Sequence, residues 1–283
     1  MDHSGVIELT ADQYQSYMQS HNEKDYLLID VRQSQEYEQS HIPGATLMPL
    51  SEFESRLFEL PDNKELVFYC KIGSRSQMAA MLADEAEVTE KPIYHLSGGI
   101  HDWSGRTLTD FPKIKVLESA GSFRELLVTA MDMERGAERF YQYARDRHED
   151  APFAITFDQL SKVETAHARI IYDIYKKSSE TEPEAFDTFY ENLAGEILES
   201  GERLEQMVGR LESIETNICI ALMELALNIE YAAYDLYRSA ATKGGIGNDA
   251  ADLFLDIAQA EKNHMRLIAK ALADCPAGEQ EGA

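Results

Sequence analysis

Two short motifs in the second half of the chain place a histidine three residues after a glutamate. The first pairs Glu164 with His167, and the second pairs Glu261 with His264. Residues three apart lie on one face of a helix, so each pair can bind a single metal ion. One such motif alone would more often be two exposed helix residues. Here, however, the residues around the motif are repeated as well.

A single glutamate precedes each motif. Glu134 and Glu230 occupy matching places in two similar segments, which indicates one helical hairpin used twice. Four helices with two such motifs and two single glutamates supply the ligands of a di-iron or di-manganese carboxylate bundle. The predicted metal ligands are Glu134, Glu164, His167, Glu230, Glu261 and His264. Their carboxylates can balance two divalent cations, and carboxylates with imidazole suit iron or manganese, while zinc would also bind.

A different kind of chemistry is indicated in the first half, where Cys70 is followed by a short loop and a helical stretch. The loop contains Gly73, which permits a sharp bend, and two cations, Lys71 and Arg75. Backbone N–H groups of residues 71–75, the dipole of the next helix and the two cations all favour a thiolate. The pattern predicts a nucleophilic cysteine in an anion-binding loop, and the alternative is a buried, inert thiol.

The elements that would position Cys70 alternate along the first 115 residues. Apolar runs at 27–31, 66–70 and 92–96 predict buried strands, and residues 51–59 and 76–87 predict helices. This alternation predicts an α/β domain with a parallel sheet over residues 1–115. Cys70 would then stand at the carboxyl end of a strand.

Over about residues 5–112 the sequence resembles the rhodanese family. The matching pieces are Asp30-Val31-Arg32, His41-Ile42-Pro43-Gly44-Ala45, the Cys70 loop, and Leu96-Ser97-Gly98-Gly99-Ile100 with Trp103. The resemblance implies that Cys70 carries sulfane sulfur as a persulfide. It also implies a substrate-anion cradle, with Arg75 as a catalytic group, made of Lys71, Ile72, Gly73, Ser74 and Arg75.

Loop length separates this chemistry from that of related phosphatases. Those enzymes place an arginine six residues after the cysteine, whereas Ser76 stands at that position here. The shorter loop favours sulfur over phosphate. The other matching residues are expected to be structural: an Asp30–Arg32 ion pair, a turn at His41, a close backbone approach at Gly98-Gly99, and Trp103 in the core.

In the second half of the chain, the spacing of apolar residues becomes that of helices. After a linker at 107–119, helices are expected at 120–148, 153–178, 213–242 and 248–273, with a loose tail after residue 275. The segment 184–212 would be the long crossover that such a bundle needs. The chain is therefore predicted to be a multi-domain protein, with an all-α, ferritin-like four-helix bundle over residues 120–275.

This half resembles the rubrerythrin-like branch of the ferritin family over about residues 120–275. The resemblance implies that the six metal ligands bind two irons, with Glu164 and Glu261 as bridges. Tyr141 and Tyr237 could be hydrogen-bond partners of the ligands or core residues, and Glu138 and Glu224 are expected on the surface.

Two departures from that family matter. Rubrerythrins that reduce peroxide carry another glutamate three residues after the third-helix ligand, where this chain has Ala233. Their usual rubredoxin module needs CxxC motifs, and the sequence contains none. An external electron donor is therefore expected.

Composition limits the partners and the compartment. The formal net charge of −25 disfavours binding to nucleic acid or to anionic membranes. No apolar run has the length of a membrane span, and the first residues do not resemble a secretion signal. The three cysteines, Cys70, Cys219 and Cys275, are far apart in sequence, and we expect reduced thiols in a cytoplasmic protein.

The favoured function is a sulfurtransferase fused to a di-iron bundle that acts on peroxide, O₂ or a sulfur species. Its expected partners are a small sulfur donor, a thiol acceptor, an external electron donor and a second copy in a homodimer. One alternative is a peroxidase or ferroxidase with the rhodanese-like domain as a sensor or docking module. The other is a non-catalytic iron-binding scaffold.

Overall fold

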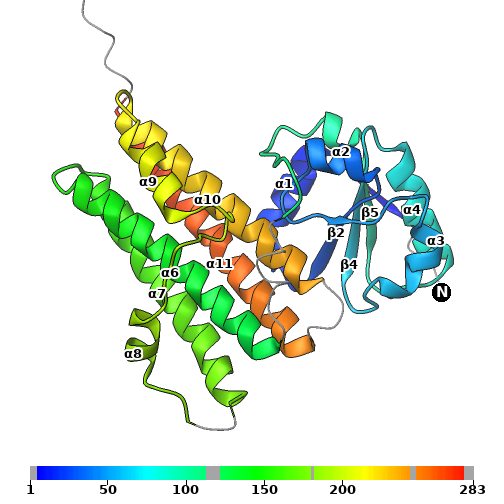
Figure 1. Cartoon of the computed structure of the whole chain (residues 1–283). Helices are drawn as coiled ribbons and strands as arrows, with labels where there is room; N and C mark the ends of the chain where they lie inside the picture. The colour runs from blue at the N-terminus through cyan, green and yellow to red at the C-terminus, as the bar shows by residue number, and fades with distance from the viewer. Residues whose placement is uncertain (1–4, 113–121, 180–181, 243–246, 277–283) are drawn as a thin grey trace, which may run out of the picture. The chain divides into compact units, whose positions relative to one another are not determined.

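The computed structural model describes residues 5–112, 122–179, 182–242 and 247–276 (Figure 1). Most of the predicted linker and of the predicted loose tail lies outside these residues. Contacts divide the chain into two compact units, residues 1–112 with 237–259 and residues 113–236 with 260–283. The sheet and the metal-ligand cluster belong to different units and are treated separately below.

A five-stranded parallel sheet organises the first part of the chain. Its order is β1 (Ile7–Leu9), β5 (Ile93–Leu96), β4 (Glu65–Tyr69), β2 (Tyr26–Asp30) and β3 (Thr46–Leu47). The three predicted strands are present as β2, β4 and β5. The edge strands β1 and β3 were not predicted, because two or three residues carry too little pattern to identify a strand.

Helices cover both faces of this sheet. On one face, Ile29 and Phe68 pack in a cluster that includes α3 (Phe53–Arg56) and α4 (Ser74–Glu85). On the other face, Leu28 and Val67 pack in a cluster that includes α1 (Ala11–Ser20) and α2 (Ser34–Gln39). Short 3₁₀ helices follow at η1 (Leu57–Glu59) and η2 (Gly99–His101). Because both faces are buried, the central strands are continuous apolar runs.

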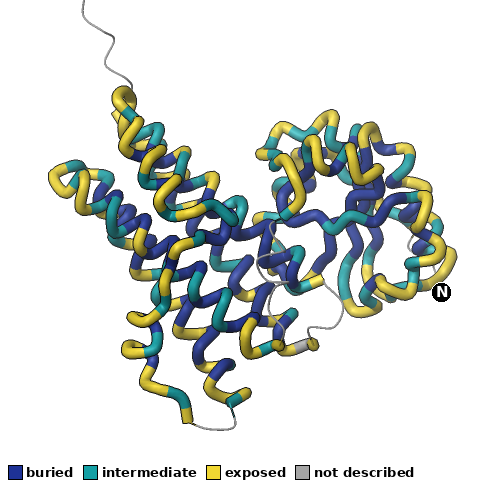
Figure 2. The backbone as a smooth tube through the Cα atoms, viewed as in Figure 1, coloured by how far each residue is buried: buried dark blue, intermediate teal, exposed yellow. Residues whose placement is uncertain are grey.

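Four long helices confirm the predicted helical architecture of the second half. They are α6 (Phe123–Arg147), α7 (Ala154–Lys177), α10 (Ile218–Ala241) and α11 (Asn248–Ala273). The Ser122 hydroxyl caps α6 by accepting a hydrogen bond from the Glu125 N–H at 3.2 Å. Figure 2 shows buried residues along the inner sides of the helices and exposed residues outside. None of the helices in the described ranges is long and apolar enough to span a membrane.

The predicted crossover contains two short helices, α8 (Phe186–Glu191) and α9 (Leu204–Glu212). Leu198, Met207 and Leu211 of this segment are buried in the same hydrophobic cluster as residues of the long helices. The crossover is therefore part of the folded core of the bundle.

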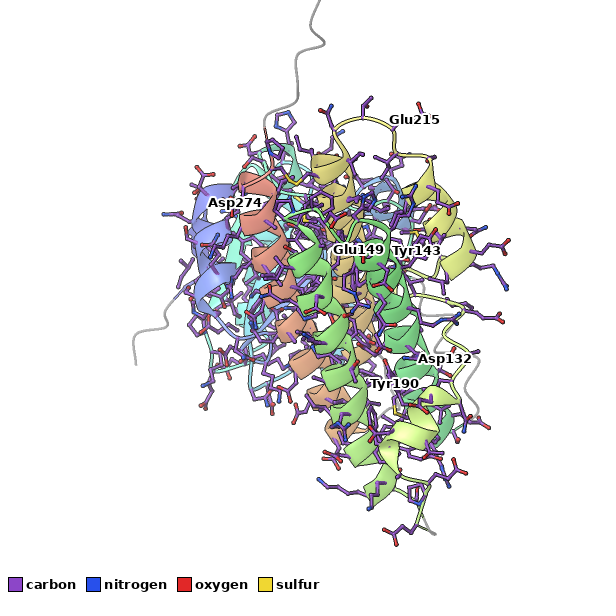
Figure 3. The ribbon with its side chains drawn as sticks, turned by 90° about the vertical axis from the view of Figure 1, so that its left-hand side faces the viewer. Asp132, Tyr143, Glu149, Tyr190, Glu215 and Asp274 are labelled. Carbon is purple, nitrogen blue, oxygen red and sulfur yellow. A yellow bond between two sulfur atoms is a disulfide. The ribbon has the colours of Figure 1, made fainter. Side chains whose placement is uncertain are left out.

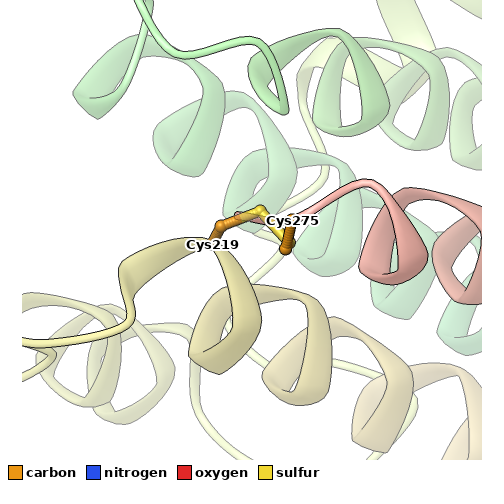
Figure 4. The surroundings of a disulfide bond; sticks show 2 residues. All are labelled: Cys219 and Cys275. Atoms are coloured by element: carbon orange, nitrogen blue, oxygen red, sulfur yellow. A yellow bond between two sulfur atoms is a disulfide. The ribbon is translucent and has the colours of Figure 1, made fainter. Parts of the chain in front are cut away.

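The cysteines correct one expectation. Cys219, in the first turn of α10, forms a disulfide with Cys275, just beyond α11, and their Cα atoms are 5.7 Å apart (Figure 4). The expectation of reduced thiols was wrong for this pair, while Cys70 is free and buried. The sequence separation of 56 residues hid the pairing, because only the antiparallel return of α11 along α10 brings the two positions together.

Candidate active site and metal centre

The Cys70 loop lies at the carboxyl end of β4, between that strand and α4. Gly73, just before α4, has φ +102°, which strongly favours glycine. Gly99 lies against the loop so closely that a Cβ there would collide with the Cys70 carbonyl oxygen. That carbonyl accepts a hydrogen bond from the Ile100 N–H at 2.8 Å. Gly73 lets the loop turn tightly, and Gly99 lets the backbone approach the cysteine closely. The close approach was predicted for Gly98-Gly99.

The Cys70 sulfur receives hydrogen bonds from its own loop. The Gly73 N–H donates to Sγ at 3.1 Å, and the Ser76 Oγ lies 3.6 Å from Sγ and 2.9 Å from the Gly73 carbonyl oxygen. Burial by itself raises the pKa of Cys70, but the Ser76 hydroxyl and the N–H groups of Ser76, Ile72 and Gly73 bring the pKa below its usual value. The loop therefore favours the thiolate.

The two positively charged residues of the loop, Lys71 and Arg75, have different surroundings. Lys71, like Ser74, is exposed, whereas Arg75 makes two hydrogen bonds to the carboxylate of Glu36, at 2.7 and 2.8 Å. The Arg75 hydrogen bonds hold the pKa of Glu36 at about 2. The charge of Arg75 is thus largely neutralised, and the hydrogen bonds to Sγ come from the loop itself.

Sequence reasoning missed Ser76 and Glu36. The phosphatase comparison uses Ser76 only as the residue in place of an arginine, although a hydroxyl in the first turn of α4 was a usable signal. Glu36 lies 39 positions from Arg75 and had no local signal.

The other motif residues have structural roles. Arg32 forms a buried ion pair with Asp30 at 2.6 Å, as predicted. His41 Nδ1 lies 3.2 Å from the Tyr37 carbonyl oxygen, and its ring stacks on that of Tyr37. Trp103 is half-buried and packs on Tyr14. These residues support the fold around the Cys70 loop.

The six predicted metal ligands come together inside the bundle, and all six are buried. Glu134 comes from α6, the Glu164–His167 pair from α7, Glu230 from α10, and the Glu261–His264 pair from α11. Their approach requires two helical hairpins, α6 with α7 and α10 with α11, that are separated in sequence by the crossover. The repeated hairpin therefore places its matching residues around one centre.

The ligands form two overlapping groups. His167 Nδ1 lies 3.3 Å from Glu134, 3.4 Å from Glu164 and 3.4 Å from Glu261. His264 Nδ1 lies 2.9 Å from Glu230, 3.0 Å from Glu261 and 3.6 Å from Glu164. The two imidazole rings stack at 4.9 Å between centroids. Each group has one histidine, one glutamate of its own and the same two shared glutamates.

These distances fit metal coordination. Two ligand atoms that each lie about 2.1 Å from one ion, at a right angle to each other, are about 3 Å apart. Among the described residues, His167 Nδ1 is a buried nitrogen with no hydrogen-bond partner, although three carboxylates surround it. An oxygen- and nitrogen-rich set of this kind suits iron, manganese or zinc.

The electrostatics of the centre also favour a cation. Burial and the neighbouring carboxylates raise the pKa of Glu164 and Glu261 well above the usual value for glutamate. Burial lowers the pKa of His264, but Glu230 and Glu164 raise it to about 9. Protons therefore stabilise the cluster without metal, and metal ions would replace them.

Two tyrosines that the sequence left open differ in their surroundings. The Tyr141 hydroxyl donates a hydrogen bond to the Glu230 carboxylate, so it is a partner of a predicted ligand. Tyr237 is buried and stacks on Phe254.

Glu224 is exposed as expected, but Glu138 is not: it is buried and paired with Arg135. Glu138 was misjudged because a contact from another helix covers it: the Thr165 hydroxyl of α7 donates a hydrogen bond to its carboxylate at 3.0 Å.

Comparisons with known proteins divide the chain in the same way. A family model described as a rhodanese-like domain matches residues 10–106, and one described as rubrerythrin matches residues 125–216. The second match includes Glu134, Glu164 and His167 and ends before Glu230.

Similar proteins cover the first part of the chain. A sulfurtransferase of Allochromatium vinosum is 32% identical over 81 residues, which are 29% of this chain and 74% of that protein. YrkF of Bacillus subtilis, named as a candidate sulfur carrier protein, is 34% identical over 104 residues, 37% of this chain and 54% of YrkF. The chain thus spans about half the length of YrkF. A crystal structure of a rhodanese-like domain protein from Staphylococcus aureus is 20% identical, with a TM-score of 0.34, and the match covers 37% of this chain and 99% of that one.

Proposed function

The chain joins a rhodanese-like domain to a rubrerythrin domain, and we propose that it is a sulfurtransferase that carries sulfur on Cys70 and that also contains a di-metal redox centre. The sulfur donor would be thiosulfate, a persulfide or a polysulfide, and the acceptor a thiol or cyanide. The observation that supports this most directly is the set of hydrogen bonds aimed at the Cys70 sulfur from its own loop.

The proposed transfer has two steps. The Cys70 thiolate attacks the sulfane sulfur of thiosulfate, the S–S bond breaks, and sulfite leaves with the bonding electron pair. The acceptor thiolate or cyanide then attacks the outer sulfur of the Cys70 persulfide, and the Cys70 thiolate leaves. No net oxidation of the protein occurs. The N–H groups of Ile72 and Gly73 and the Ser76 hydroxyl would stabilise the anion at the start and the end of this cycle.

In this proposal, the sulfur donor reaches Cys70 through the exposed residues of its loop. Cys70 is fully buried, whereas Ile72 of the same loop is 62% exposed. The exposed residues of the loop would contact the donor, and Lys71 would attract its negative charge. Arg75, already paired with Glu36, would mainly hold the loop against α2.

In the bundle, the six buried glutamates and histidines would hold two metal ions, for which iron is the proposed identity. When bound, iron supplies one-electron redox chemistry toward peroxide, O₂ or a sulfur species. Glu164 and Glu261 would bridge the ions, Glu134 and Glu230 would bind one ion each, and the Tyr141 hydroxyl would orient Glu230. Electrons would come from an external donor.

One experiment tests both halves. Protein purified without oxygen is analysed for metal and by optical spectroscopy before and after peroxide, and sulfur transfer from thiosulfate to cyanide is measured in parallel. We expect two irons per chain, an oxidation-dependent absorption change, and transferase activity that Cys70→Ser abolishes without changing metal content. Zinc alone, or no metal after iron reconstitution, would overturn the redox centre. Full activity in Cys70→Ser would overturn the sulfur carrier.

A further inference from the structure

The crossover segment carries one buried carboxylate that the predicted ligand set does not include. Glu199 lies between α8 and α9, outside the repeated motifs, and is 3% exposed. Among the described residues, neither of its carboxylate oxygens has a hydrogen-bond partner. A buried carboxylate without donors is costly, and proteins usually compensate it with a cation.

The backbone before Glu199 is fixed against α6, the helix that carries Glu134. The Asp132 carboxylate accepts a hydrogen bond from the Gly195 N–H at 3.0 Å, and Arg139 donates to the Ala194 carbonyl oxygen (Asp132 is labelled in Figure 3). Gly136 lies between these two anchors, and a Cβ there would collide with the Ile197 carbonyl oxygen. The crossover thus lies directly on the turns of α6 on either side of Glu134.

A short loop then turns Glu199 inward. Ile197 pairs with Arg203 in a β-bridge, and the Leu198 N–H donates to the Glu202 carbonyl oxygen at 3.0 Å. Leu198 is fully buried in the bundle core. Glu199 follows it directly, so its backbone is held at the edge of that core.

The charges that act on Glu199 agree with this placement next to the turns of α6 around Glu134. They belong to Glu134, Glu164 and Glu230, three of the predicted metal ligands. Burial and these like charges raise the pKa of Glu199 well above its usual value. A buried, unpartnered carboxylate held next to the helix turn that carries Glu134 has a clear physical role if a cation lies nearby.

We propose that Glu199 is a seventh protein ligand of the metal centre, contributed by the crossover. This inference rests on the proposed metal centre and adds a residue to it. With Glu199 the ligands carry five carboxylates in place of four, one more negative charge than two divalent ions neutralise. The extra charge favours the state in which one ion is trivalent, so Glu199 would also lower the reduction potential of a bound iron pair.

The test compares Glu199→Gln with wild-type protein, using Co²⁺ as the probe. Glutamine keeps the size of the side chain and removes its charge. We expect the affinity for the more weakly bound Co²⁺ to fall by about 10- to 100-fold, with a change in the visible absorption of bound Co²⁺. We also expect the metal-free variant to melt at a higher temperature than metal-free wild type, because glutamine removes the charge repulsion between Glu199 and the ligand carboxylates.

The matched control is Glu196→Gln in the same segment. Glu196 is exposed and paired with Arg203. This change should leave Co²⁺ binding unchanged and should shift the melting temperature of the metal-free protein much less than Glu199→Gln does. Glu199→Asp, which keeps the charge and shortens the side chain, should bind Co²⁺ with intermediate affinity and serves if the glutamine variant does not fold.

The outcomes separate two failures. Wild-type protein that binds no Co²⁺ would contradict the metal centre itself. Wild-type protein that binds two ions, together with Glu199 variants that have unchanged affinity and spectrum, would overturn the role of Glu199 and leave the six-residue centre intact.

Discussion

Glu164 and Glu261 each direct one carboxylate oxygen toward His167 and the other toward His264. The oxygens of Glu164 lie 3.4 Å from His167 and 3.6 Å from His264, and those of Glu261 lie 3.4 and 3.0 Å from the same nitrogens. Glu134 and Glu230 each approach one histidine. The two shared glutamates therefore have a different role from the two terminal ones.

This difference predicts different metal stoichiometries. Glu164→Ala or Glu261→Ala removes a ligand from both groups, so we expect both ions to be lost or bound weakly. Glu134→Ala or Glu230→Ala removes a ligand from one group, so we expect one ion to remain. Metal analysis after reconstitution and desalting measures the ratio. Equal loss in all four variants would contradict the distinction between shared and terminal ligands.

The Ser76 hydroxyl predicts a shift in the pH dependence of Cys70. Its single proton can be donated to the Gly73 carbonyl oxygen or to sulfur, and a thiolate accepts more strongly than a thiol. Ser76→Ala should raise the pKa of Cys70, so the rate of iodoacetamide alkylation should reach its midpoint at higher pH.

Ser74→Ala provides the control for this experiment, because Ser74 is an exposed serine of the same loop and helix start. Its alkylation profile should match that of wild type. A Ser76→Ala profile that also matches wild type would show that the backbone N–H groups alone set the thiolate.

The Cys219–Cys275 disulfide predicts a stability difference that depends on redox conditions. Cys219→Ser should lower the free energy of unfolding of the metal-free bundle by about 2–4 kcal/mol, because the link restricts the unfolded chain. Urea unfolding without reductant measures the effect, and added dithiothreitol should remove the difference from wild type. Sulfur transfer should be unchanged, since Cys70 is a separate, free thiol. Identical unfolding in both conditions would contradict a stabilising disulfide.

The close contact of Gly136 with the crossover predicts that this contact contributes to the stability of the bundle. A Cβ at this position would overlap the Ile197 carbonyl oxygen, which is backbone and cannot rotate away. Gly136→Ala should therefore destabilise the bundle by about 1–3 kcal/mol, despite the better helix propensity of alanine.

The matched variant for that contact is Gly209→Ala in α9, where a Cβ would have nothing within 4 Å. It should leave stability unchanged or raise it by about 0.5–1 kcal/mol. Thermal unfolding of both variants compares the two glycines directly. Stabilisation by both substitutions would mean that the crossover can move away from α6 at little cost.

The sequence by itself determined the features that depend on local spacing. Residues three apart on a helix share a face in any fold, so the Glu164–His167 and Glu261–His264 pairs and their repeat could be recognised without coordinates. Apolar runs between helical stretches predicted β2, β4 and β5, and a glycine soon after Cys70 predicted the tight loop.

Tertiary structure decided every relationship between residues without a common local pattern. Glu36 reaches Arg75 from α2, Cys219 meets Cys275 because α11 returns along α10, and Glu199 enters the bundle from a crossover with no repeat. Such pairings depend on how helices and loops pack, which is set by the summed burial of many side chains. Local patterns in a single sequence do not show which distant side chains pack together, whereas the folded structure does.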